Sequence, residues 1–125
     1  MTKYRSPRKR LEEALDKACR EYVLARDEKC ILCGSIDVLQ NSHYIRRGHH
    51  SVRWDLRNQH AMCKRCHYKH HNGYEYLYAE FMHKTYGDEV MEELTALANI
   101  PAYKWSIPEL EEMLARVERL TSELA

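Results

Sequence analysis

Two Cys-x-x-Cys pairs are the strongest chemical signal in this 125-residue chain. Their members are Cys30, Cys33, Cys63 and Cys66. Zinc in structural sites takes four thiolate or imidazole ligands in a tetrahedron, and two such pairs supply all four. A site with four protein ligands has no open position, so we expect a structural zinc ion and not a catalytic one. Gly34 permits the tight turn that directs both sulfurs of the first pair towards one metal.

A second series of polar residues lies between and after these pairs. Its members are His43, Asn58, His67 and His71. His67 and His71 are one helical turn apart, so both imidazoles would project from one face and could hold a divalent cation. Such a cation would neutralise a scissile phosphate and stabilise the leaving oxygen. His43, neutral near pH 7, could accept a proton from an attacking water. Asn58 would fix the loop that carries this base, or contact the metal itself.

The net charge of +1 conceals a separation of charge along the chain. Residues 1–10 contain five basic residues and no acid, and residues 46–69 contain seven basic residues against Asp55 alone. Residues 88–125 contain nine carboxylates against three basic residues. A basic segment over the candidate site suits contact with nucleic acid on one face, and an ordinary solvated mixture of charges is the alternative. The predicted phosphate contacts are Arg46, Arg47, Arg53, Lys64 and Lys69.

The elements that would position these residues follow from the local sequence pattern. Residues 7–27 have a helical period of apolar residues, and Pro7 suits a first helical turn. Residues 36–45 favour a strand, and residues 52–61 favour a second strand or an irregular return. The second cysteine pair is expected to open a helix, which Asn72-Gly73 then breaks.

A further helix is predicted to run to Tyr86 and to stop at Gly87. Beyond Gly87 the chain becomes helical and acidic, and residues 88–99 are predicted to form a short helix. Glu109 stands three residues after Ser106, which is a capping-box signature at the start of a last helix. That helix either packs on its own domain or forms the contact of a homodimer. Its apolar stripe consists of Leu110, Met113, Leu114, Val117 and Leu120.

The composition excludes several other classes. No apolar run approaches the length of a membrane span. No secretory segment follows Met1, so we expect a cytoplasmic protein. Five cysteines in such a chain argue for metal binding and against a disulfide framework. Cys19, the odd one, is predicted to be a small buried hydrophobe.

These motifs resemble those of HNH endonucleases of the ββα-metal class. The resemblance lies in Ser42-His43-Tyr44, in Arg57-Asn58-Gln59-His60 and in the second cysteine pair with His67. More narrowly, the chain is similar to the lambdoid phage recombination endonucleases called Rap or NinG. That similarity covers about residues 10–95 and adds Arg53-Trp54-Asp55, Gly73 and Tyr86-Gly87-Asp88-Glu89-Val90.

The resemblance implies an α+β fold, in which a zinc-stapled ββα core is flanked by N- and C-terminal helices. It also implies hydrolysis of DNA phosphodiesters in branched recombination intermediates, with Mg²⁺ or Mn²⁺ as the catalytic metal. His43 would be the general base, His67 and His71 the ligands of that metal, and Asn58 a positioning residue or third ligand. Residues 1–87 would form the nuclease domain and residues 88–125 a helical extension.

Two positions depart from the family pattern. Ser42 stands where many HNH enzymes have the Asp or His that binds the metal. His67 stands where a Rap-like protein has Asn, which moves the site towards a two-histidine metal clamp. The first departure leaves the metal one ligand short unless another residue contributes, and the candidates are Asn41, Asp37 and Asn58.

Two other classes of function compete with the nuclease. A zinc-knuckle module that binds nucleic acid without catalysis would need the cysteines and the basic segment only. A protein-interaction domain working through the C-terminal helix would need no affinity for DNA. For the nuclease, the expected partners are branched duplex DNA and a second copy of the chain.

Overall fold

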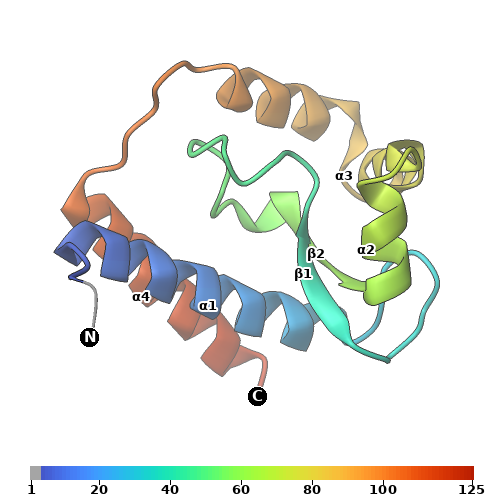
Figure 1. Ribbon diagram of the computed structural model, residues 1–125, viewed down its shortest axis with the longest axis horizontal. Helices are drawn as coiled ribbons and strands as arrows, with labels where there is room; N and C mark the ends of the chain where they lie inside the picture. The colour runs from blue at the N-terminus through green and yellow to red at the C-terminus, as the bar shows by residue number, and fades with distance from the viewer. Residues whose placement is uncertain (1–3) are drawn as a thin grey trace.

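The computed structural model describes residues 4–125, and Lys3 of the basic N-terminal arm lies outside this range. In chain order its elements are α1 (Pro7–Asp27), β1 (Leu39–His43), the 3₁₀ helix η1 (Leu56–Asn58), β2 (Gln59–Cys63), α2 (Lys64–His70), α3 (Glu75–Ala98) and α4 (Ile107–Glu123). This mixture of helices with a small sheet confirms the α+β class. In Figure 1 the β1–β2 hairpin lies between the α1–α4 pair and α2 with the start of α3.

Helix α1 has the bounds that the sequence predicts, because both of its ends carry a local signal. The Ser6 side chain accepts a hydrogen bond from the backbone N–H of Lys9, and Pro7 occupies the first turn. At the other end Glu28 takes a left-handed conformation, with φ of 63°, and its N–H bonds to the carbonyl of Leu24. None of the described helices is both long enough and apolar enough to cross a membrane.

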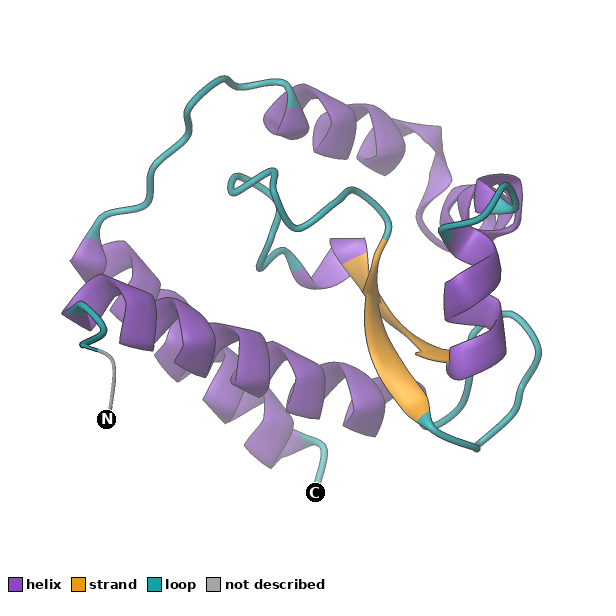
Figure 2. Ribbon diagram, in the orientation of Figure 1, coloured by secondary structure: helices purple, strands orange, loops and turns teal. Residues whose placement is uncertain are grey.

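The two strands form an antiparallel hairpin, seen between the helices in Figure 2. β1 is shorter than the predicted strand over residues 36–45, because Val38 has a left-handed φ of 45° that interrupts extended backbone. Residues 52–58 make the irregular return, through a turn and η1, and regular pairing with β1 begins at Gln59. Asp55 caps η1 by accepting a hydrogen bond from the N–H of Arg57.

The pairing register decides what each face of the hairpin presents. Successive strand residues point to opposite faces. Asn41 and His43 therefore share the face that lines a cavity with α1. Gln40 and Ser42 share the other face, where the Gln40 side chain reaches His67 of α2.

Helix α2 begins at Lys64, directly after the last residue of β2, as the sequence predicts. Gly73, with φ of 95°, makes the turn into α3. Gly87, with φ of 81°, breaks helical geometry inside α3, which therefore consists of two helices that meet at a kink. The prediction that one helix stops at Gly87 and another follows it is confirmed. Met91 and Leu94, beyond the kink, pack in the same core cluster as Tyr78 and Met82, before it. The division at residue 87 stays a prediction.

The last helix starts with the predicted capping box, in which Ser106 and Glu109 bond each other's backbone N–H groups. Leu110 and Val117 of its apolar stripe are buried in a cluster with Leu15 and Cys19 of α1. The stripe therefore packs within the chain, as the first of the two interpretations holds. The homodimer stays a prediction. The most buried part of this stripe already packs against α1 and is not free for a dimer contact.

A buried hydrogen-bond chain ties the hairpin to α3. Tyr78 donates to the carbonyl of Ser42, so its oxygen accepts from Nδ1–H of His60, and Nε2 of His60 accepts from the hydroxyl of Tyr86. Burial lowers the pKa of His60 to about 3, with the charge of Arg26 acting in the same direction. His60 is therefore a neutral structural residue, and it fixes β2 against the kinked helix.

Candidate metal centre and active site

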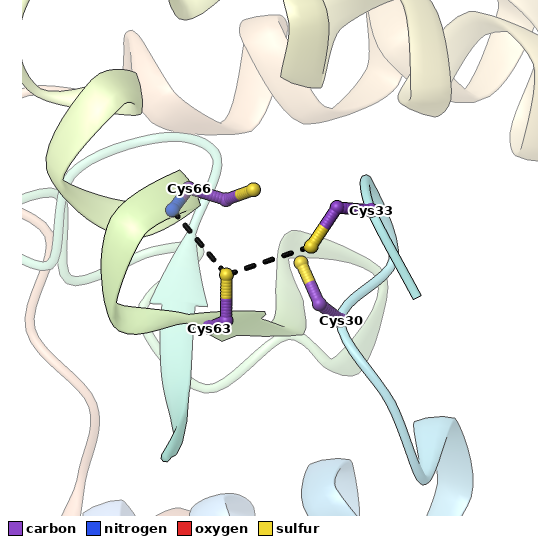
Figure 3. A group of neighbouring side chains, drawn as sticks. All are labelled: Cys30, Cys33, Cys63 and Cys66. Carbon is purple, nitrogen blue, oxygen red and sulfur yellow. Dashed lines mark hydrogen bonds between the residues drawn. The ribbon is translucent and has the colours of Figure 1, made fainter. Parts of the chain in front are cut away.

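The four sulfurs of the cysteine pairs converge on one point. All four lie within 4.8 Å of one another, and the Sγ atoms of Cys33 and Cys63 are 3.6 Å apart. A tetrahedral zinc–thiolate site places its sulfurs about 3.8 Å apart, given Zn–S bonds of about 2.3 Å. Figure 3 shows Cys30 and Cys33 reaching in from the loop after α1, opposite Cys63 and Cys66 at the start of α2. The geometry fits a closed four-cysteine zinc site.

The local backbone explains why the sulfurs meet. Cys30 follows the end of α1, and a tight turn bonds the N–H of Gly34 to its carbonyl. Cys63 ends β2 and also caps α2, since its sulfur accepts from the N–H of Cys66. A backbone hydrogen bond from Ser35 lowers the pKa of the Cys33 thiol to about 6, which favours the thiolate that zinc binds. Within residues 4–125, this is the one group of three or more His, Cys, Asp or Glu side chains arranged to hold a metal.

Cys19 is separate from this centre. It is fully buried in the α1–α4 cluster, and burial raises the pKa of its thiol to about 11. The prediction of a small buried hydrophobe is confirmed.

His43, the predicted base, is held in a defined tautomer. Its Nε2 lies 2.9 Å from the carbonyl oxygen of Arg53, and a carbonyl only accepts, so Nε2 carries the proton. Nδ1 is then unprotonated, has no partner within residues 4–125 and is not among the buried unpaired atoms. Burial lowers the pKa of His43 to about 4, and the neighbouring cations Arg47 and Arg53 add to the effect. The ring is therefore neutral at pH 7.

Asn58 fixes the loop between the strands. Its Oδ1 accepts from the N–H of Ile45 at 2.8 Å, and its Nδ2 donates to the carbonyls of Ile45 and Val52 at 3.0 and 3.1 Å. The side chain is fully buried. These contacts are those of a positioning residue, which is one of the two roles that the sequence left open.

His67 and His71 lie together on α2, with ring centroids 4.8 Å apart. Nδ1–H of His67 donates to Oε1 of Gln40 at 2.6 Å, so its Nε2 is the unprotonated nitrogen that a metal would take. Burial lowers the pKa of His67, and the nearby His71 and His70 lower it further, which favours the neutral form of the ring. The contact of Gln40 with His67 was not predicted from the sequence. The only signal for it is that Gln40 lies two residues before Ser42 in a strand, so that both side chains point to the same face.

The three candidates for a further metal ligand do not join this pair. Asn58 is committed to the loop, Asn41 lies on the α1 face of β1, and Asp37 is exposed in the loop that follows the first cysteine pair. Ser42 is buried, and its Oγ has no hydrogen-bond partner.

The two histidines of α2 and His43 of β1 lie on opposite faces of the hairpin. β1 has β2 on one side only, so its other edge is not paired with a strand and is open in this sense.

The predicted phosphate contacts divide into two kinds. Arg53 is an internal residue: its side chain is 13% exposed, pairs with Asp16 at 2.6 Å and lies over the Trp54 ring. Its guanidinium is thus engaged by Asp16, which Arg47 shares, and its role as a phosphate contact stays a prediction. The others are at the surface, and they are Arg46, Arg47, Lys64 and Lys69.

The family described as "Bacteriophage Lambda NinG protein" matches residues 2–125. The chain belongs to the NinG family. The match extends beyond residues 10–95, where the motifs lie, and it makes this a phage recombination-related protein. A search of curated proteins and a search of solved structures each gave no match.

The zinc centre of this NinG-family chain gives a direct prediction. The purified protein should contain one zinc ion per chain, and Cys63→Ser should lose the metal and most of the fold, because metal-binding energy in such sites is folding energy. Elemental analysis and circular dichroism measure both.

Cys19→Ala is the matched control, because it removes a buried cysteine outside the cluster. It should keep its zinc. Folded wild-type protein without zinc would contradict the assignment of the cysteines.

Proposed function

We propose that this NinG-family chain is a metal-dependent DNA endonuclease of the HNH type, which hydrolyses phosphodiesters in branched recombination intermediates. The state of His43 is the observation that carries the proposal. A general base needs a fixed ring with a free, unprotonated nitrogen at the operating pH. The bond from Nε2 to the Arg53 carbonyl supplies the fixed ring, and Nδ1 is the free nitrogen.

The chemistry proposed for His43 is the activation of water. Nδ1 takes a proton from a water molecule while the water oxygen bonds to phosphorus. The bond between phosphorus and the leaving oxygen breaks, and that oxygen takes up a proton from solvent. His43 then returns its own proton to solvent. Water is thereby added across one P–O bond, and no further reactant is required.

His67 and His71 are the proposed ligands of the catalytic Mg²⁺ or Mn²⁺. A divalent cation bound there neutralises the scissile phosphate and stabilises the leaving oxygen. Gln40 fixes the tautomer of His67, as partners of metal-binding histidines commonly do. The open edge of β1 is where a phosphodiester could be reached from the His43 face and the α2 face together.

The surface charges support DNA as the substrate. Arg46 and Arg47 follow β1, and Lys64 and Lys69 lie on α2, so exposed cations occur both after the strand that carries His43 and on the helix that carries His67 and His71. Such contacts bind phosphates without reading sequence. Membership of a phage recombination-related family favours branched DNA. Two coordinated cuts in a branch need two active sites, and for this reason we also propose a homodimer.

One observation favours a second candidate, a zinc-knuckle module that binds nucleic acid without cutting it. Within the described residues, no carboxylate joins His67 and His71 in a group of three ligands. Ser42, at the position where related enzymes have a ligand, is buried. This candidate predicts DNA binding that is independent of divalent metal.

The first test of the nuclease proposal is His43→Ala. Loss of a general base should lower the rate of DNA cleavage by roughly 10²–10⁴-fold while DNA binding survives. His83→Ala is the matched control, since His83 is exposed on α3 and pairs with Asp88. Cleavage by the His43 variant at the wild-type rate would refute the proposed role.

The pH dependence of the cleavage rate tests the same role of His43. His43 acts in its neutral form, and its pKa is lowered to about 4. The rate should therefore hold as pH falls through about 6.5, the ordinary histidine value, and should fall only nearer to pH 4. An acid limb with its midpoint at the ordinary value would contradict the burial of this base.

The second test separates the two metals. His67→Ala should weaken activation by Mg²⁺ or Mn²⁺ while the zinc content stays unchanged, because the imidazole is outside the cysteine cluster. A higher Mn²⁺ concentration should restore part of the activity. If the variant loses its zinc, His67 is a structural residue and the proposed clamp is wrong.

A further inference from the structure

A small cavity lies on the α1 face of β1, beside the proposed base. Its volume is about 230 Å³, and it is lined by Asp16 and Arg20 of α1, Asn41 and His43 of β1, and Arg47. That space holds a phosphate group together with ordered water, since one water in the liquid occupies about 30 Å³. The zinc-stapled core consists of the hairpin and α2. α1 is not part of this core, so the residues that it places beside His43 are additional to it.

The charges around this cavity do not cancel. The Asp16 carboxylate accepts from four N–H groups: Nε and an Nη of Arg53, Nε1 of Trp54 and an Nη of Arg47, at 2.6 to 3.2 Å. Asp16 therefore holds Arg47 and Arg53 in place, but its single charge cannot balance both. Arg20 is exposed and forms no hydrogen bond or ion pair with residues 4–125. An excess of positive charge is left beside a neutral imidazole.

Asn41 shapes one wall of the cavity. Its side chain donates from Nδ2 to Oε1 of Gln59 at 2.8 Å, which sets the direction of the amide. Its Oδ1 is buried away from solvent, so the groups that the cavity offers to a ligand are His43 and the arginines.

We infer that this cavity binds the scissile phosphodiester beside His43, with Arg20 and Arg47 contacting its non-bridging oxygens. The inference rests on the proposed nuclease function and adds to it the place of the phosphate and the contribution of α1. Guanidinium groups suit this role because they donate two parallel hydrogen bonds to phosphate oxygens.

The test compares Arg20→Ala with Arg119→Ala in the zinc-loaded full chain. Arg119 is also an exposed arginine, on α4, and its loss changes the net charge equally. Arg20→Ala should lower kcat/KM for DNA cleavage by about 10- to 100-fold, the usual effect of losing a hydrogen bond to a charged group. Arg20→Lys should recover part of the activity, and Arg119→Ala should match the wild type. Zinc content confirms that each variant is folded.

A second measurement is independent of cleavage. Inorganic phosphate is titrated into the same proteins while the imidazole resonances of His43 are followed by NMR. Saturable shifts should occur in the wild type and in Arg119→Ala, and they should be weakened in Arg20→Ala.

The outcomes separate this inference from the proposed function. Phosphate-dependent shifts that require Arg20, in a wild-type protein that cuts no DNA, would support the cavity as an anion site and refute the nuclease. Metal-dependent cutting that is unchanged in Arg20→Ala, with unchanged phosphate shifts, would support the nuclease and overturn the assignment of this cavity.

Discussion

The fold depends on one constraint, the convergence of four cysteine sulfurs from two distant segments. Cys30 and Cys33 follow the end of α1, and Cys63 and Cys66 join the end of β2 to the start of α2. A zinc ion at this point would tie the first helix to the hairpin and set the direction in which α2 leaves it. A chain of this size buries only part of its apolar surface, and a two-stranded hairpin is marginal alone, so we expect a bound metal to contribute much of the stability.

The rest of the site follows from what the hairpin presents on its two faces. Asn58 and His60, both buried, fix the loop and the back of the hairpin through hydrogen bonds that leave no ring or amide group of theirs without a partner. With the hairpin rigid, His43 is aimed at the α1 side, and Gln40 supports His67 on the α2 side. The base and the metal ligands that we propose are thus separate clusters, which a substrate at the open edge of β1 would join.

The parts of this structure that were predictable from sequence are those with local causes. Ser6 and Ser106 mark helix starts through caps, and the cysteine spacing marks the zinc centre. The strand predicted in place of β1 was too long, because the residue type at Val38 gives no signal of its left-handed backbone conformation. The contacts that sequence missed are all non-local: Asp16 pairs with Arg53 across 37 positions, and the stripe of α4 covers α1. Nothing in the local pattern around Arg53 distinguishes an internal ion pair from a phosphate contact.

The most direct test of the account is a cleavage assay on zinc-loaded protein with Mn²⁺, Mg²⁺ or EDTA, using a synthetic four-way junction and a linear duplex of the same sequence. The account predicts cutting that depends on the added divalent metal, faster on the junction than on the duplex, with the zinc content unchanged throughout. Folded, zinc-loaded protein that binds both DNAs but cuts neither with any of these metals would contradict it, and would leave the zinc-knuckle binding module as the better description.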